Sequence, residues 1–174
     1  MPEQPSTDHD TTPATHDDAT VVRVHEIPAH IRALATIADP DYIDLFTLAT
    51  DATAAGTPHQ WARAAFEKEA GPAGQFVWRV LLGLRLAWRS APTQVAGWRI
   101  AGQGHNWLTL EARSWMLTGN LVVHLDDDQM AMATAISYDR PIAERVWTRL
   151  SRTHRRLAPA LLRDARTTLA QTQR

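Results

Sequence analysis

The chain has 174 residues, of which 44% are hydrophobic and 21% charged, and its formal net charge is −1. These values are typical of one globular domain and exclude an intrinsically disordered chain. The sequence has no cysteine, which excludes disulfide frameworks, thiolate nucleophiles, zinc ribbons and iron–sulfur clusters. No run approaches the length of a membrane-spanning helix and no secretory leader opens the chain, so we expect a cytoplasmic protein with no integral membrane segment.

Charge is distributed unevenly along the chain. Residues 1–20 contain five acidic residues and no Lys or Arg, and they are almost without large apolar side chains. We expect a disordered acidic tail there and a single domain over residues 21–174. From Arg140 to the end, nine arginines outnumber two acidic residues. Such a basic end can bind nucleic acid or an acidic membrane surface, but the spacing favours the solvated face of a helix, so we expect no nucleic-acid partner.

The first elements are predicted from short apolar runs. Residues 21–24 and 42–50 are rich in β-branched and aromatic side chains and predict two strands. Thr57 then resembles a helix N-cap, with Pro58 at the first helical position and Gln60 at the third, which is close to a capping box. This helix should end near Gly71, and a second apolar helix should follow from Phe76.

Residues 95–138 predict an antiparallel meander. Strands are expected near 95–101, 106–117, 120–126 and 129–138, separated by turns at 102–104, 118–120 and 126–128. Because side chains alternate along a strand, each strand should present two chemically different faces. In the second strand one face carries Leu108, Leu110, Ala112, Ser114 and Met116, and the other carries Trp107, Thr109, Glu111, Arg113 and Trp115. In the fourth, Met130, Met132, Thr134, Ile136 and Tyr138 share one face, opposite three alanines.

A long amphipathic helix is predicted at the C-terminal end, opening near Pro141. Its apolar stripe at steps of three and four consists of Ile142, Val146, Leu150, His154, Leu157, Leu161 and Ala165, with Trp147 at its border. Most of the arginines lie off this stripe. We therefore expect the helix to cover one face of the sheet with this stripe.

Residues 21–170 resemble the helix-grip superfamily, which includes START-related lipid-transfer proteins and polyketide cyclase/dehydrase-like bacterial proteins. The resemblance rests on the element order, the Trp- and Arg-rich strands and the segments 57–63 (TPHQWAR), 145–147 (RVW) and 154–157 (HRRL). It implies an α+β fold in which a curved antiparallel sheet wraps a long C-terminal helix, with two shorter helices after the first strands. It also implies a ligand cavity between sheet and helix, but it names neither the ligand nor any catalytic residue by position.

Three residues are the candidate catalytic groups. His154 lies on the apolar stripe and would face the cavity, where an imidazole can exchange a proton near neutral pH; the alternative is a core histidine bonded to the backbone or to a strand residue. Tyr138 lies on the inward face of its strand, and Asp44 and Tyr42 could supply further hydrogen bonds. Glu111 is the third candidate, on the strand face that also carries two tryptophans.

The position of Glu111 and Arg113 depends on which strand face is concave. If their face lines the cavity, they form a polar pair that could orient a carbonyl or carboxylate. If it is convex, they are solvated cross-strand partners, and the apolar character of the opposite face favours this second arrangement. The candidate ligand-binding side chains are Trp98, Trp107, Arg113, Trp115, Met132, Trp147 and Leu150. No spacing indicates a metal site or a dinucleotide loop, so we expect no cofactor.

Two functions remain open. The first is a cofactor-independent cyclase, dehydratase or isomerase acting on a polyketide-like or related hydrophobic metabolite, with His154 or Tyr138 moving protons. The second is a non-catalytic binding or transfer protein that holds a lipid-like ligand in the same cavity. In both cases the partner is a hydrophobic small molecule, and the sequence leaves a homodimer open.

Overall fold

The computed structural model describes residues 20–50, 56–87 and 91–172. The elements, in chain order, are β1 (Val21–Val24), α1 (Ala29–Leu34), β2 (Tyr42–Ala49), α2 (Pro58–Arg63), the π-helical η2 (Ala64–Glu69), α3 (Gly71–Phe76), the π-helical η3 (Val77–Leu81), β3 (Gln94–Val95), β4 (Trp98–Gln103), β5 (Trp107–Arg113), β6 (Leu117–Leu125), β7 (Gln129–Tyr138) and α4 (Pro141–Thr172). The expected acidic tail falls, apart from Thr20, outside the described residues.

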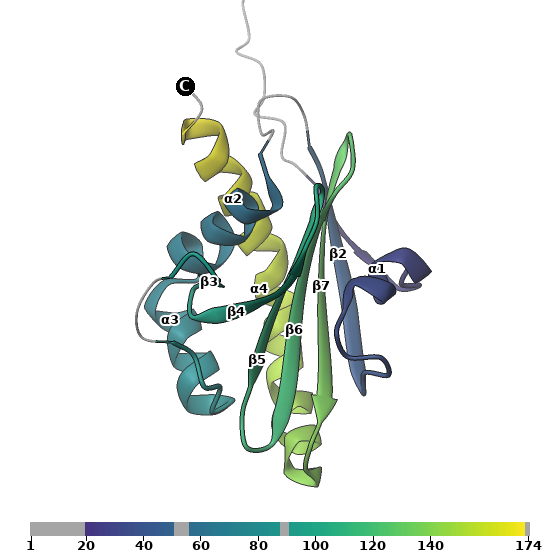
Figure 1. Cartoon of the computed structure of the whole chain (residues 1–174), viewed down its shortest axis with the longest axis vertical. Coiled ribbons are helices and arrows are strands. Elements are labelled where there is room, and N and C mark those ends of the chain that lie inside the picture. Colours follow the sequence, from purple (N-terminus) through teal and green to yellow (C-terminus); the bar gives the residue numbers. More distant parts are fainter. Residues whose placement is uncertain (1–19, 51–55, 88–90, 173–174) are drawn as a thin grey trace, which may run out of the picture.

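The strands form one curved antiparallel sheet in the order β1-β2-β7-β6-β5-β4-β3 (Figure 1). The long helix α4 and the segment from α2 to η3 lie against one face, here called the interior face, which carries Phe46, Leu110 and Met132. The small helix α1 covers part of the opposite, outer face over Leu45 and Val122. The α+β class, the antiparallel meander and the closing helix are therefore confirmed. No helix among the described residues is long and apolar enough to cross a bilayer.

The capping box predicted at the start of α2 is confirmed. The Gln60 backbone N–H donates to Thr57 Oγ1 at 3.2 Å, and Gln60 Oε1 accepts from the Thr57 backbone N–H at 2.8 Å. These two bonds satisfy N–H groups that a helix start otherwise leaves unpaired. The first helical segment ends at Glu69, near Gly71 as predicted, but the next helix, α3, begins already at Gly71, which has a φ of 51°, and not at Phe76. A left-handed φ favours glycine because it has no Cβ.

The hairpin predicted at residues 118–120 lies four residues earlier. The β5–β6 turn is made by residues 114–116, where Ser114 Oγ accepts from the backbone N–H groups of Met116 and Leu117, each at 3.1 Å. Gly119 is instead a strand residue, where a Cβ would come within 3.3 Å of Ile136. Asn120 is a fully buried strand residue whose side chain bonds to the segment after α1. Both turn-forming residues thus serve tertiary contacts.

The buried stripe of α4 is displaced by one residue from the predicted one. Its buried members are Ala143, Trp147, Ser151, Ala158, Leu162, Ala165 and Leu169. Of the predicted stripe, Ile142 and Leu157 are exposed, while Val146, Leu150 and Leu161 pack at the border of the core. The helix therefore has an apolar flank beside its buried stripe. Stripe and flank together present more apolar surface than the sheet covers. The predicted face assignments of β5 over residues 107–113 and of β7 are confirmed.

Candidate functional site

A cluster of polar side chains interrupts the apolar interior face where α4 crosses β2. Asp44 on β2 has a side chain with no solvent exposure, and both its carboxylate oxygens lie near His154 of α4, at 3.2 and 3.4 Å from Nε2. The hydroxyl of Tyr42 donates to the same carboxylate at 2.5 Å. Thr134 of β7, the cross-strand neighbour of Asp44, places its hydroxyl 3.4 Å from His154 Nε2. We call Tyr42, Asp44, Thr134 and His154 the interior cluster.

Aromatic rings enclose this cluster. The Trp147 ring makes an edge contact with Tyr42 and lies 5.6 Å from the His154 ring, while Phe46 packs against His154 at 6.2 Å. His154 keeps 22% of its side chain exposed. The imidazole therefore links a fully buried carboxylate to the protein surface, and a molecule at the surface can reach it.

The environment of Tyr42 holds its phenol in the neutral form. Burial, the hydrogen bond to Asp44 and the negative charge of that carboxylate raise the pKa of Tyr42 well above its usual value, while the nearby Arg155 opposes this shift. The phenol thus remains a donor to Asp44. Because an ionised carboxylate only accepts hydrogen bonds, the His154 nitrogen facing it must carry a proton. In neutral His154, Nδ1 is then the nitrogen left with an available lone pair.

Two indole N–H groups on the same side of the sheet have no hydrogen-bond acceptor among the described residues. The side-chain nitrogens of Trp147 and Trp98 are both buried and make no hydrogen bond among the described residues. Trp98 lies on the interior face of β4, where Trp78 of η3 packs edge-on against it at 5.7 Å. A buried donor without an acceptor carries a free-energy cost. These two donors are therefore places where a ligand oxygen or a water would be stabilised.

The apolar flank of α4 adjoins His154. Leu150 and Leu161 lie one turn or two from it along the helix and are only partly buried. The same flank carries Thr168, seven residues beyond Leu161, whose hydroxyl donates to Glu69 of η2 at 2.6 Å. The C-terminal part of the flank therefore faces η2, which α3 and η3 follow in the chain. On α3 and η3, Phe76 and Val80 are 55% and 61% exposed.

The structure places Glu111 in a second polar cluster, on the outer face. Its Oε1 accepts from Arg99 at 2.8 Å and from Arg113 at 3.2 Å, and its Oε2 lies 2.7 Å from the Thr36 hydroxyl. Asn120 Oδ1 accepts from the backbone N–H groups of Thr36 and Ile37 at 2.8 and 3.1 Å. We call Thr36, Arg99, Glu111, Arg113 and Asn120 the outer cluster. It fastens the segment after α1 to the sheet.

Hydrogen bonding and charge determine the ionisation of Glu111. Burial alone would raise its pKa, but the Thr36 hydrogen bond and the two guanidinium groups outweigh burial and hold the pKa of Glu111 below its usual value. The carboxylate is therefore ionised and fully engaged. The sequence left open which face of the strand carries Glu111 and Arg113. In the structure they lie on the outer, convex face, so the sheet separates them from His154.

The remaining predicted residues are distributed over several places. Tyr138 is an interior-face residue, four positions along β7 from Thr134, or about 13 Å at 3.3 Å per residue, so the structure does not bring it to His154. Trp107 lies on the outer face, with its ring against Gly102 and Gly104. Trp115 is an exposed residue of the β5–β6 turn. Met132, Trp147, Trp98 and Leu150 lie on the interior side, and their role in ligand binding stays a prediction.

Two surface depressions lie away from the interior cluster. One, of about 850 Å³, is lined by residues 26–38 around α1, and the other, of about 640 Å³, by the start of α2 and the turns before β5 and after β6. Neither contains Asp44 or His154. The described side chains between the sheet and α4 form one packed core. A ligand at the interior cluster must therefore approach the exposed edge of His154 or displace packed core side chains.

Comparison with protein-family models, curated proteins and solved structures finds no match. The site is thus defined by its geometry alone. Sequence reasoning named Asp44 and Tyr42 only as further hydrogen-bonding groups, and it did not pair Asp44 with His154, 110 residues away. The available signal was a charged residue between Tyr42 and Phe46 on an otherwise apolar strand face. No group of His, Asp or Glu among the described residues is arranged to hold a metal ion.

Proposed function

We propose that this protein is a helix-grip protein that binds an apolar small molecule carrying a carbonyl group and catalyses a proton transfer on it without a cofactor. The reaction class is a cyclisation, dehydration or isomerisation of a polyketide-like or related metabolite. The observation that carries the proposal is the pairing of fully buried Asp44 with partly exposed His154. A carboxylate that orients an imidazole and fixes its tautomer is an arrangement that supports general-base chemistry.

Each polar group of the site has a role in this reaction. Asp44 accepts from His154 Nε2 and Tyr42, which leaves Nδ1 of His154 to take a proton from a carbon next to the substrate carbonyl. Negative charge then develops on the carbonyl oxygen, where the unpaired N–H of Trp147 can donate to it. The protonated imidazole returns the proton to another atom of the substrate, so the protein is unchanged after each turnover.

The apolar part of the ligand is assigned to the flank of α4 and the facing helices. Leu150 and Leu161 offer partly covered surface beside His154, and Phe76 and Val80 offer exposed surface on α3 and η3. Burying such surface favours binding by about 25 cal/mol per Å². We assign the admission of a ligand along this flank to an outward movement of α3 and η3. The π-helical turns η2 and η3 and the left-handed glycines at both ends, Gly71 and Gly83, support such a movement.

Deuterium exchange separates this enzyme from a carrier. The protein is incubated in D₂O with 1-tetralone, an apolar cyclic ketone, and deuterium at the carbon next to the carbonyl is followed by mass spectrometry. We expect uptake above the buffer rate, falling by about 10²-fold or more in His154→Gln. The control is His105→Gln, which changes an exposed histidine distant from the interior cluster.

The outcomes separate the two functions. Saturable tetralone binding, measured by quenching of tryptophan emission, with no deuterium uptake would favour the non-catalytic binding or transfer protein. Uptake that is equal in His154→Gln and the unchanged protein would remove His154 from the reaction. Native mass spectrometry of the freshly purified protein provides a second readout, because a ligand retained from the host would appear as a mass increment.

A further inference from the structure

The outward surface of α4 carries a row of five arginines that no other described residue neutralises. They are Arg145, Arg149, Arg152, Arg156 and Arg163. All five are exposed, and none of their guanidinium groups makes a hydrogen bond or an ion pair with another described residue. Arg145 and Arg163 lie 18 positions apart on one helix, or about 27 Å at 1.5 Å per residue. We call this row the arginine ridge.

The ridge is electrostatically unfavourable for the isolated helix. Arg145 and Arg149 are four residues apart, as are Arg152 and Arg156, and like charges at this spacing destabilise a helix by a few tenths of a kcal/mol per pair. No acidic residue stands three or four positions from any member of the ridge. A solvated helix face commonly alternates the two signs of charge. An extended anionic partner would remove this repulsion.

Exposed apolar side chains accompany the arginines. Ile142 and Leu157 on the adjoining flank are 40% and 59% exposed. Leu157 follows Arg156 in the sequence. Because successive side chains are about 100° apart around a helix, Leu157 lies on the flank beside the ridge. The phosphate backbone of a nucleic acid duplex presents mainly charged and polar groups, with little apolar surface for these two side chains. A second copy of the chain, joined about a two-fold axis along this helix, would bring one ridge against the other.

We propose that the arginine ridge and its neighbours Ile142 and Leu157 are a docking surface for an anionic lipid bilayer. The arginines lie at the level of the lipid phosphates, and the two apolar side chains enter the boundary between headgroups and acyl chains. An amphipathic helix with this arrangement binds parallel to the membrane plane, through electrostatic attraction and apolar burial together. The proposal is independent of the chemistry at His154.

Vesicle sedimentation tests the proposal with the full chain. Vesicles of phosphatidylcholine alone are compared with equimolar phosphatidylcholine and phosphatidylglycerol, at low and at raised salt. We expect binding only to the anionic vesicles, weakening as salt screens the charges. The double variant Arg149→Gln/Arg152→Gln should bind about 25-fold more weakly, at about fivefold per arginine near an anionic surface. Leu157→Ser should lose about fivefold through its apolar contact.

Matched controls keep the outcome specific. Arg23→Gln/Arg32→Gln removes the same total charge from exposed positions on β1 and α1, and Val22→Ser removes an exposed apolar side chain from β1. Both should bind as the unchanged protein does, and circular dichroism checks that every variant is folded. Equal losses in the ridge and control variants, or no binding to anionic vesicles at low salt, would overturn the proposal. So would salt-sensitive binding to duplex DNA in the absence of vesicle binding.

Discussion

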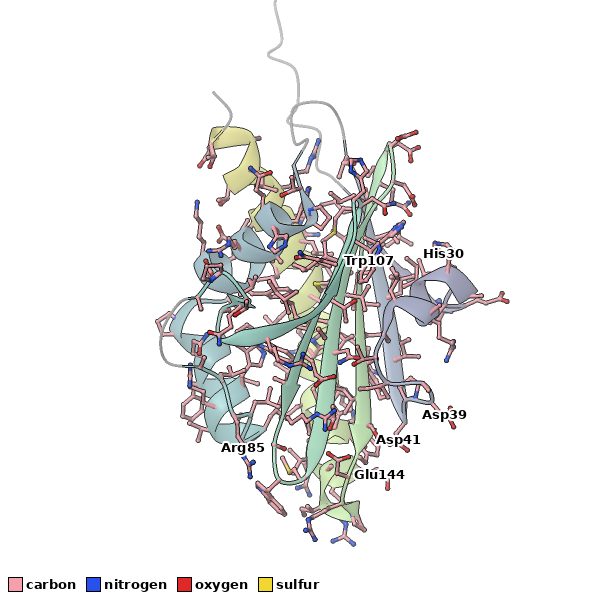
Figure 2. All side chains as sticks on the ribbon, viewed as in Figure 1. His30, Asp39, Asp41, Arg85, Trp107 and Glu144 are labelled. Atoms are coloured by element: carbon pink, nitrogen blue, oxygen red, sulfur yellow. The ribbon has the colours of Figure 1, made fainter. Side chains whose placement is uncertain are left out.

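The two faces of the sheet each hold a polar cluster, and the clusters differ in how completely their groups are bonded. In the outer cluster, Glu111 accepts from Arg99 and Arg113, and Asn120 accepts two backbone N–H groups. In the interior cluster, Asp44 is bonded but His154 keeps an exposed edge. The indole N–H of Trp147, beside His154, has no hydrogen-bond acceptor among the described residues. Figure 2 shows how densely side chains fill the space between the sheet and the helices.

We propose that this difference separates a structural role for the outer cluster from a functional role for the interior cluster. In a network whose polar groups are all bonded within the protein, no donor or acceptor is left for a ligand. Removing such a network should lower the stability of the fold. A network with an unpaired donor and an accessible imidazole still has groups that can bond to a ligand. Removing it should affect binding and chemistry more than folding. Residue type alone does not distinguish them, because both clusters centre on a buried carboxylate beside basic groups.

Breaking the outer cluster should have the largest effect on stability. Glu111→Ala leaves Arg99 and Arg113 without their carboxylate, and because both guanidinium groups remain hydrated we expect a loss of about 2 kcal/mol. The measurement is the free energy of unfolding in urea. Glu26→Ala, which removes an exposed carboxylate, serves as the control and should change it by less than about 0.5 kcal/mol. Equal losses in the two variants would show that the outer cluster does not fasten the segment after α1.

The same cluster should make stability depend on acid pH. The pKa of Glu111 is lowered in the folded state from a reference of 4.5, so its contribution is complete above that value and is lost as pH falls through the folded-state pKa. The difference in unfolding free energy between the unchanged protein and Glu111→Gln should therefore shrink below about pH 4.5. A difference that stays constant over this window would contradict the assigned ionisation.

Tyr42→Phe tests the interior cluster and should cost less. It removes one hydrogen bond to Asp44 but retains the ring contact with Trp147, so we expect a loss of about 1 kcal/mol at neutral pH. Because the folded-state pKa of Tyr42 is raised from a reference of 10.0, this contribution is complete below that value and declines as pH rises above it. Urea unfolding at neutral and alkaline pH measures both effects, and a loss that grows in alkali would refute them.

The smallest effect that we expect is the coupling free energy between the outer and the interior cluster. They lie on opposite faces of the sheet and share no partner, so Glu111→Gln and His154→Gln should be additive within about 0.5 kcal/mol in a double-mutant cycle. A larger coupling energy would mean that the sheet transmits strain between its faces. The division into a structural and a functional cluster would then fail.

Local patterns predicted much of the fold, because they depend on neighbouring residues. The capping box at Thr57 and Gln60 and the alternation along β7 are set by contacts within a few residues, and both are confirmed. The β5–β6 turn was placed wrongly because Gly119 and Asn120, which favour turns, are required here by the Ile136 and Thr36 contacts. The one-residue displacement of the α4 stripe has a similar origin, since the helix has more apolar surface than the sheet covers.

The candidate site could be predicted only in part. His154 was found because a histidine on an apolar stripe is unusual, but its pairing with Asp44 depends on how α4 crosses β2. No local signal encodes that crossing. The orientation of Glu111 toward the outer face depends on which side of the sheet the last helix packs, and the sequence left this open. The helix α1, which covers the outer face, is too short for its pattern to be recognised.

The most direct test of the account compares Asp44→Asn with Glu111→Gln in the same two assays. Both changes replace a buried carboxylate by an amide of similar shape. We predict that Asp44→Asn lowers deuterium transfer to 1-tetralone by about 10²-fold or more while the protein stays folded, and that Glu111→Gln lowers stability with transfer unchanged. Transfer rates that are equal in the two variants would contradict the assignment of the interior cluster as the functional one.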